Sequence, residues 1–264
     1  MGGLEEHLRA VRARIDVAAR AAGRDPASVA LLAVSKTRPS ADVRALLALG
    51  QQDFGENRAQ ELVEKAAELA DVPVRWHFIG QLQRNKAAAV ARLGAVVHSV
   101  DRLPLAQVLD RVGQDIGRPV EVLLQVDLGG RHLEGQHLEG PHLEGRAGGA
   151  APRGGADPSA VPALADAVAG CPGLRLRGLM AVAPLGGDPA AAFGRLAELA
   201  ARVRADHPGA VELSAGMSGD LEAAVAAGAT VVRVGTALFG ARPLPSGEDP
   251  RTPATRVTPV TEAT

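Results

Sequence analysis

The sequence predicts an α/β protein of the (β/α)8 TIM-barrel type, preceded by one additional helix. Eight short apolar runs are spaced along the chain, and each but the last is followed by a stretch with helical periodicity. The runs are almost continuously apolar, as in a parallel sheet that is covered on both faces. An open, doubly wound sheet is the alternative, but no Gly-x-Gly-x-x-Gly motif follows the first run. We therefore expect a closed barrel.

The additional helix is expected over residues 4–22, where Leu4, Leu8, Val11 and Ile15 recur on one stripe. Eight strands are then expected at residues 29–35, 52–55, 74–80, 95–99, 120–127, 174–182, 210–214 and 230–235. Helices are expected between them at residues 40–49, 57–70, 84–93, 103–113, 159–169, 188–205 and 218–227. This order fills one domain, over residues 1–243.

Two segments do not fit the repeating pattern. Residues 128–157 carry His-Leu-Glu-Gly three times, starting at His132, His137 and His142. These histidines and glutamates are metal-ligand types, but the frequent glycines disfavour a rigid ligand geometry, so we expect a solvated loop insertion and no metal. Residues 244–264, rich in proline and threonine, are expected to be a disordered tail.

Composition excludes several classes of protein. The chain of 264 residues has a formal charge of −1, without the basic excess that is typical of nucleic-acid binding. No apolar run reaches the roughly 18 residues of a membrane span, and the charged N-terminal segment lacks the apolar centre of a signal peptide. The single cysteine, Cys171, excludes an internal disulfide and fits a reducing compartment. We expect a cytoplasmic protein.

Lys36 is the first candidate for chemistry. The chain has three lysines among its 29 basic residues, and Lys36 directly follows the first expected strand. Active sites of such barrels lie at the carboxyl ends of the strands. Arginine keeps its proton near neutral pH, whereas a desolvated lysine can attack a carbonyl. A solvated loop lysine is the alternative; the functional hypothesis is a Schiff base with an aldehyde cofactor or a keto substrate.

The last two strands are followed by turns that are typical of phosphate binding. "LSAGMSGDLEAA" leads into a helix with Ser218 or Gly219 near its N-cap, and Gly235-Thr236 opens a short helical turn in "VVRVGTALFG". Ordinary helix capping explains either turn alone, but two turns after the last two strands favour phosphate. Arg233 lies in an otherwise apolar strand. It either forms a core ion pair with a carboxylate, reaches solvent at an end of the strand, or faces the ring nitrogen of a pyridine cofactor.

Six ordered motifs carry a resemblance to a known family. They are "LLAVSKT", "FGENRAQE", "WHFIGQLQRNK", "VHSVDR", "LRGLMAV" and "LSAGMSGDLEAAVAAGATVVRVGTALFG". Together they resemble the pyridoxal phosphate homeostasis protein family, over about residues 4–243. The resemblance implies a barrel similar to the N-terminal domain of alanine racemase, which binds pyridoxal 5′-phosphate (PLP) as a Schiff base and has no firmly assigned reaction.

The resemblance also implies roles for individual residues. Lys36 would carry the Schiff base, and Arg233 would face the pyridine nitrogen. Asn57 and His77 would line the ring pocket. The phosphate would be held by Ser214, Ser218, Gly235 and Thr236.

The sequence departs from the family pattern at three places. Arg58 stands where the family usually has tyrosine, and Gln81 stands where proline is usual. The loop after the fifth strand has the His-Leu-Glu-Gly insertion and Arg153 where relatives often carry lysine. These departures leave the implied cofactor site intact and bear on contacts made by the loops.

Three functions compete. A PLP-binding protein of PLP homeostasis is favoured over a PLP-dependent racemase and over a cofactor-free Schiff-base aldolase. Alanine racemases of this fold use a tyrosine as the second base, and the chain contains no tyrosine. We therefore expect a non-catalytic protein of vitamin B6 metabolism whose partners are PLP and PLP-requiring apo-enzymes, with no nucleic acid or membrane, as a monomer or weak dimer.

Overall fold

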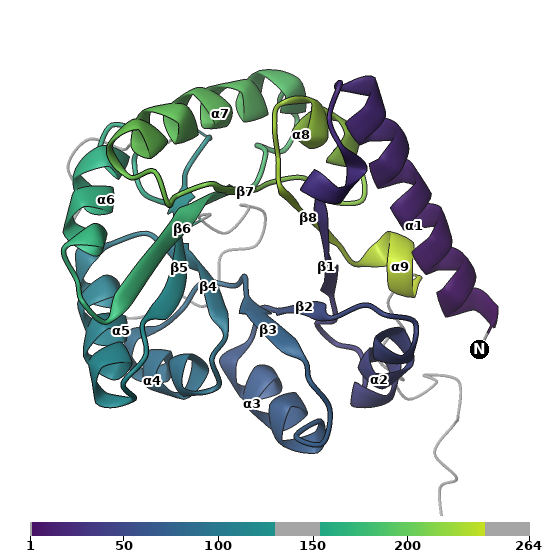
Figure 1. Cartoon of the computed structure of the whole chain (residues 1–264), viewed down its shortest axis with the longest axis horizontal. Coiled ribbons are helices and arrows are strands. Elements are labelled where there is room, and N and C mark those ends of the chain that lie inside the picture. Colours follow the sequence, from purple (N-terminus) through teal and green to yellow (C-terminus); the bar gives the residue numbers. More distant parts are fainter. Residues whose placement is uncertain (1, 130–153, 241–264) are drawn as a thin grey trace, which may run out of the picture.

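Eight parallel strands close into a barrel in sequence order, β1 to β8, with β8 pairing back onto β1. The computed structural model describes residues 2–129 and 154–240. In Figure 1 the strands surround the centre of the molecule and the helices lie outside them. The expectation of a (β/α)8 barrel is confirmed, and the open sheet is wrong.

The strands and helices lie close to the expected segments. The strands are β1 (Ala30–Val34), β2 (Asp53–Glu56), β3 (Arg75–Phe78), β4 (Val96–Val100), β5 (Val120–Val126), β6 (Leu174–Ala181), β7 (Glu212–Ser214) and β8 (Val231–Val234). The helices are α1 (Gly2–Ala21), α2 (Ser40–Ala48), α3 (Ala59–Glu68), α4 (Arg84–Arg92), α5 (Leu103–Asp115), α6 (Val161–Ala169), α7 (Pro189–Asp206), α8 (Leu221–Ala226) and α9 (Thr236–Phe239). A 3-10 turn, η1 (Pro26–Ser28), was not expected; it is capped by Asp25, whose carboxylate accepts from the Ala27 N–H.

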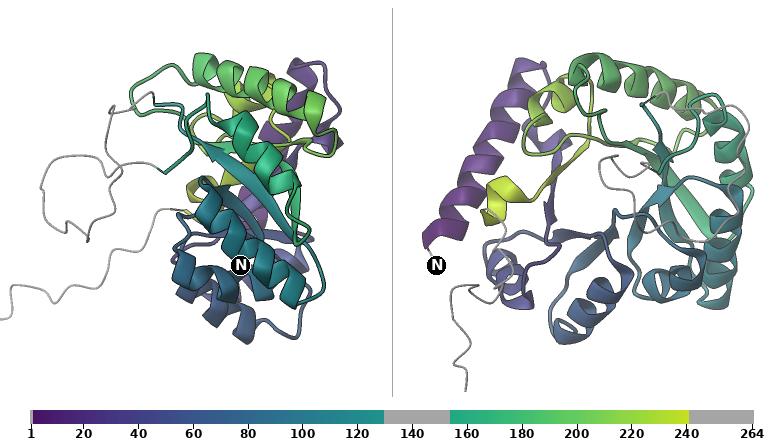
Figure 2. Two further views of the ribbon diagram at one scale, coloured as in Figure 1. Left: turned by 90° about the vertical axis from the view of Figure 1, so that its left-hand side faces the viewer. Right: turned by 180° about the vertical axis from the view of Figure 1, so that it is seen from behind.

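The additional helix α1 runs beside α8 and α9 on the outside of the barrel (Figures 1 and 2). Leu8, Val11 and Ile15 of its apolar stripe are buried, whereas Val17 on another face is 65% exposed. Burial of this stripe fixes α1 against the elements that follow β7 and β8. The first helix of the chain therefore supports the last strands.

The apolar core lies between the strands and the surrounding helices. Phe54, Trp76 and Phe78 belong to this outer core together with buried residues of every long helix. Side chains alternate along a strand, so His77, between Trp76 and Phe78, faces the barrel interior. The interior holds a small apolar cluster of Val96, Leu123 and Met180, and it also holds polar groups. A polar interior is the feature of this fold that positions the site.

A local irregularity gives β6 one residue more than its partner strand β5. Val122 pairs with Leu176 and Leu123 pairs with Gly178, so Arg177 is an extra residue on β6. Gly178 has φ of 150°, and a Cβ at this position would lie 1.8 Å from the carbonyl oxygen of Glu212. Only glycine permits this close approach of β6 to β7.

Parts of the domain prediction lie outside the described residues. These are most of the insertion, with the three His-Leu-Glu-Gly repeats and Arg153, and the tail at 244–264. The domain limits at 243 and 244 stay a prediction. No helix within residues 2–129 and 154–240 is long and apolar enough to cross a membrane.

Candidate functional site at the carboxyl ends of the strands

Lys36 emerges from β1 between the ends of β2 and β8. Val34 pairs with Gly55 of β2, and Ala33 pairs with Val234 of β8. The residues that follow on the three strands, Lys36, Asn57 and Gly235-Thr236, therefore share one rim of the barrel. Lys36 is half-buried. The structure thus brings together four of the residues that the sequence analysis singled out.

A buried ion cluster holds the backbone that carries Lys36. The ammonium of Lys65, on α3, donates to the Ser35 carbonyl and to one carboxylate oxygen each of Glu56 and Glu61, at 2.7 Å in each case. The Ser35 hydroxyl donates to the same Glu56 oxygen at 2.6 Å. Thr37 then turns the chain in a left-handed conformation with φ of 63°, which is rare for a β-branched residue. Lys36 therefore stands on a tightly held, bent segment.

Burial raises the pKa of Glu56, and hydrogen bonds from Lys65 and Ser35 oppose this rise. The second carboxylate oxygen of Glu56 is buried and has no hydrogen-bond partner among the described residues. The sequence analysis missed Lys65. The signal was available: Lys65 follows Glu61 by one helical turn and Leu62 by three residues, on the buried face of α3.

Asn57 lies against the backbone of the loop that follows β3. A Cβ at Gly80 would lie 2.1 Å from the Asn57 carbonyl oxygen, so the loop can approach only with glycine there. The side-chain oxygen of Asn57 is buried without a partner among the described residues. An unpaired buried acceptor is uncommon, and it is the kind of group that a bound ligand satisfies.

The two candidate phosphate turns lie in contact. The Ser218 hydroxyl accepts from the Ala237 N–H at 3.4 Å and so links the turn after β7 to the start of α9. Gly216 has φ of 88°, and a Cβ there would lie 2.6 Å from the Cβ of Ala224. Ser218 and Gly219 lie near the N-cap of α8, as expected; Asp220 is the N-cap itself, and its carboxylate accepts from the Met217 N–H inside the turn.

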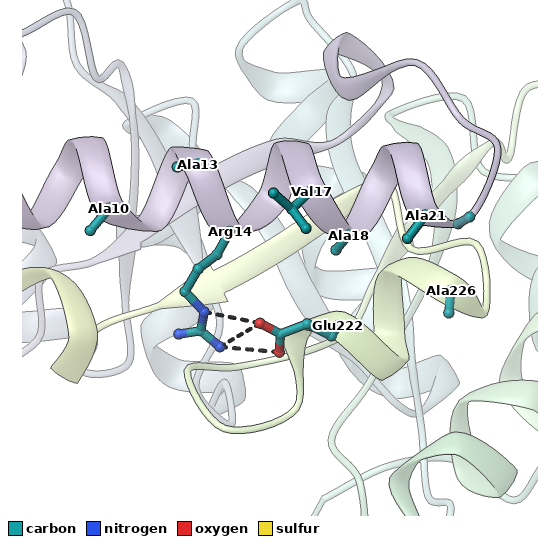
Figure 3. Close-up of a pocket in the computed structure, with 9 residues that line it drawn as sticks. Ala10, Ala13, Arg14, Val17, Ala18, Ala21, Glu222 and Ala226 are labelled. Atoms are coloured by element: carbon teal, nitrogen blue, oxygen red, sulfur yellow. Dashed lines mark hydrogen bonds and ion pairs between the residues drawn. The ribbon is translucent and has the colours of Figure 1, made fainter.

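Helix α1 holds both of these turns from outside. Arg14 donates to the Ser218 carbonyl at 3.1 Å. It also donates to the Glu222 carboxylate at 2.9 Å (Figure 3). His7 Nδ1 lies 3.1 Å from the Leu238 carbonyl oxygen in α9. The surface groove in Figure 3, of about 460 Å³, lies between α1 and α8 and contains none of the predicted site residues.

Inside the barrel, Arg233 donates to neutral oxygens alone among residues 2–129 and 154–240. Its Nη1 donates to the carbonyl and hydroxyl oxygens of Ser214 at 2.6 and 2.8 Å, and its Nη2 donates to the Ala181 carbonyl at 2.8 Å. Burial lowers the pKa of Arg233 to about 10, which still leaves it charged at neutral pH. Among the described residues, Arg233 therefore does not form the core ion pair with a carboxylate that was one of the expected alternatives.

His77 and His98 extend these contacts across the interior. The Ser214 hydroxyl lies 3.0 Å from His98 Nδ1, His98 Nε2 lies 2.8 Å from His77 Nδ1, and His77 Nε2 lies 3.0 Å from the Asp53 carboxylate. Burial lowers the pKa of His98 well below 6.5, and the charges of His77, Arg233 and Arg75 lower it further. Ser214 is thus engaged in the interior, and Ser218 lies in the rim turns.

Known proteins resemble the chain over most of its length. Residues 7–243 match the model of the alanine racemase N-terminal domain. The pyridoxal phosphate homeostasis protein of Pseudomonas aeruginosa is 48% identical over 245 residues, 92% of this chain and 97% of that protein. The protein of the same name from Escherichia coli K12 is 37% identical, over 92% of this chain and 98% of that protein.

Solved structures agree. PipY of Synechococcus elongatus, solved with PLP bound, superposes with a TM-score of 0.73 at 37% identity, over 90% of this chain and all of that chain. An alanine racemase from Corynebacterium glutamicum, at 17% identity, has a TM-score of 0.61 over 92% of this chain and 63% of that one, which shows the shared fold. The chain belongs to the pyridoxal phosphate homeostasis protein family, whose barrel is that of the alanine racemase N-terminal domain.

Proposed function

We propose that this protein binds PLP at the carboxyl ends of the strands, through a Schiff base on Lys36, and acts in PLP homeostasis without strong catalytic turnover. The observation that carries the proposal is the position of Lys36 between Asn57 and the Gly235-Thr236 turn in a chain whose relative PipY was solved with PLP bound. PLP bound in this way supplies an aldehyde that an amine can capture reversibly.

The residues present fit such a cofactor. Asn57 offers an unpaired buried oxygen at the rim, and Gly80 leaves the adjacent loop without a side chain. Ser218, Gly235 and Thr236 offer hydroxyl and backbone N–H groups for a phosphate at the joined turns. The proposal assigns the phosphate to these groups and the ring surface to His77 and Asn57. The hydroxyl of Ser214, the fourth phosphate candidate of the sequence analysis, lies instead between Arg233 and His98 inside the barrel.

The role proposed for Arg233 is to face the ring nitrogen of PLP. A guanidinium is a permanent hydrogen-bond donor, so it favours an unprotonated ring nitrogen and makes the cofactor a weak electron sink. Holding PLP, rather than using it for catalysis, is what this environment supports. The chain also lacks tyrosine, the second base of barrel-type alanine racemases.

The proposed partners are PLP and apo-enzymes that require it. We further propose a cytoplasmic location, supported by a single cysteine, Cys171, with no second cysteine for a disulfide. A monomer or weak dimer is the proposed form, and size-exclusion chromatography with light scattering measures it.

The test is covalent labelling of Lys36. The protein incubated with PLP should develop a visible absorption band that borohydride abolishes, and mass spectrometry should place the reduced pyridoxyl group on Lys36. The variant Lys36→Ala should lose the band and remain folded, because Lys36 is half-buried and its side chain makes no hydrogen bond to the core in the part of the chain that the structure describes.

The matched control is Lys86→Ala, which removes an exposed lysine on α4 and should leave labelling unchanged. A pyridoxyl group found on Lys65 or Lys86 in the wild-type protein would overturn the assignment to Lys36.

A further inference from the structure

A row of hydrogen bonds crosses the barrel interior from Asp53 to Arg233. It links Asp53 of β2, His77 of β3, His98 of β4, Ser214 of β7 and Arg233 of β8, with distances of 3.0, 2.8, 3.0 and 2.8 Å. Every member except Asp53 is buried. We call these five residues the interior relay.

The direction of these hydrogen bonds follows from the Asp53 end. Interaction with His77 and with Arg75 favours the charged form of Asp53, and its pKa is lowered despite burial, the largest influence, which acts the other way. A carboxylate only accepts, so a neutral His77 must carry its proton on Nε2. His77 Nδ1 is then an acceptor, and His98 must donate to it from Nε2. This leaves His98 Nδ1 to accept from the Ser214 hydroxyl.

The contacts at the Arg233 end are compatible with the same direction. A guanidinium has no acceptor, so the Ser214 hydroxyl oxygen receives the hydrogen bond from Nη1. The single hydroxyl hydrogen of Ser214 is then available for His98. With His77 neutral, the order is therefore Arg233 to Ser214 to His98 to His77 to Asp53, and both imidazoles carry their proton on Nε2.

The charges around the relay preserve this state. Arg75 lies 3.6 Å from Asp53 and 3.7 Å from Glu121, and Glu121 lies 3.4 Å from Arg177, which also pairs with Glu212. Positive charge at Arg75 and Arg233 flanks His98 from both ends of the relay and disfavours a proton there.

We propose that Asp53, His77, His98 and Ser214 are positioning residues: their hydrogen bonds hold the Arg233 guanidinium at one place and orientation for the ring of PLP. The placement of PLP beside Arg233 rests on the proposed function. The relay also limits His77, because both of its ring nitrogens are used by Asp53 and His98. His77 therefore presents only carbon atoms and its ring face to the cofactor.

The first experiment needs no cofactor. Nitrogen-15 NMR of the histidine rings in the PLP-free protein reports which nitrogen carries the proton. At a pH at which both rings are neutral, His77 and His98 should each carry the proton on Nε2. A His98 protonated on Nδ1 would overturn the proposed direction.

Asp53→Asn is the matched perturbation, because an amide can donate as well as accept and so no longer fixes the proton of His77. The variant should show a mixture of tautomers at His77 and His98. Glu212→Gln, which neutralises another carboxylate at the amino ends of the strands, should retain the wild-type tautomers. Identical spectra for Asp53→Asn and the wild type would overturn the proposal.

The second experiment tests the effect on Arg233. Asp53→Asn and Ser214→Ala should weaken PLP binding by about threefold to tenfold, the effect of one hydrogen bond, and shift the absorption band of bound PLP. Glu212→Gln should do neither. If the wild type binds no PLP, the proposed function fails while the NMR result still tests the relay. If it binds PLP and Asp53→Asn binds it identically, the positioning role fails.

Discussion

Lys65 and Glu56 form a buried ion pair beside the backbone that carries Lys36. Their nitrogen and oxygen lie 2.7 Å apart, with side chains that are 7% and 0% exposed. Removing one member of such a pair leaves an uncompensated buried charge, whereas replacing both with neutral groups is often close to neutral for stability. The effect on stability of substituting Lys65 should therefore depend strongly on whether Glu56 is also substituted.

We predict that Lys65→Met lowers the free energy of unfolding by about 3–5 kcal/mol, because Glu56 loses its cation. The double variant Lys65→Met/Glu56→Gln should be more stable than Lys65→Met alone. Urea unfolding of the wild type, Lys65→Met, Glu56→Gln and the double variant measures this coupling. Additive effects in that cycle would contradict the enclosed ion pair.

At the scale of residues, the sequence predicted the positions of some site residues and not of others. The positions of Lys36 and of the Gly235-Thr236 turn could be predicted because they lie at the ends of apolar runs, whereas Asn57 was named only through the family resemblance. The interior relay could not, because its contacts join separate strands: His98 and Ser214, for example, are 116 residues apart. Which interior side chains meet is decided by closure of the barrel, which no local pattern describes.

At the scale of elements, α1 acts on the site without contributing a residue to it. Arg14 contacts the Ser218 turn and His7 contacts α9, so one helix spans both candidate phosphate turns. The amphipathic stripe predicted the helix and its buried face. It did not predict the target of Arg14, because polar residues on the opposite face have no preferred partner in the sequence.

We predict that Arg14→Ala weakens PLP binding by about threefold to tenfold, because the Ser218 carbonyl and Glu222 lose their shared donor and the turn is less well ordered. Equilibrium titration of PLP by absorbance or fluorescence measures it. Arg9→Ala, which removes an exposed arginine paired with Glu5 on the same helix, is the control and should bind as the wild type does. Equal affinity for all three proteins would exclude a role for α1 in the site.

The element boundaries were predictable where apolar runs end in polar residues. The N-cap of the helix after β7 could not be predicted, because Ser218, Gly219 and Asp220 can each cap a helix and only the folded turn selects Asp220. β7 is also shorter than expected, since Ala210 and Val211 lie outside it. These residues precede the position at which β6 and β7 approach each other at Gly178.

At the scale of the whole molecule, the buried side chain of His98 links the stability of the fold to pH. His98 stays neutral in the folded protein because its pKa is far below 6.5, whereas it takes up a proton near that pH when unfolded. Below about pH 6.5 the unfolded state therefore binds one more proton than the folded state, and the free energy of unfolding falls as pH falls. This contribution is absent well above pH 6.5.

The predicted slope for this one group is about 1.4 kcal/mol per pH unit below pH 6.5. Chemical unfolding of the wild type and of His98→Gln between about pH 5 and 7 measures it, and the variant should have the smaller slope. His207→Gln, a substitution at a histidine paired with Asp166 on the surface, is the control. Equal slopes in the wild type and His98→Gln would mean that His98 is charged in the folded protein.

The last prediction separates binding of PLP from its use in catalysis. The barrel has the fold of an alanine racemase domain, but the 264 residues include no tyrosine to act as a second base. In its proposed place, Arg233 would also disfavour a protonated ring nitrogen. On the proposed function, the chain would then lack both the tyrosine base and the strong electron sink of a barrel-type racemase. We predict that protein loaded with PLP on Lys36 converts L-alanine to D-alanine no faster than free PLP does. Chiral chromatography with an authentic alanine racemase as positive control measures this. Sustained conversion that is lost in Lys36→Ala would show that the protein is an enzyme and that a residue other than tyrosine supplies the second base.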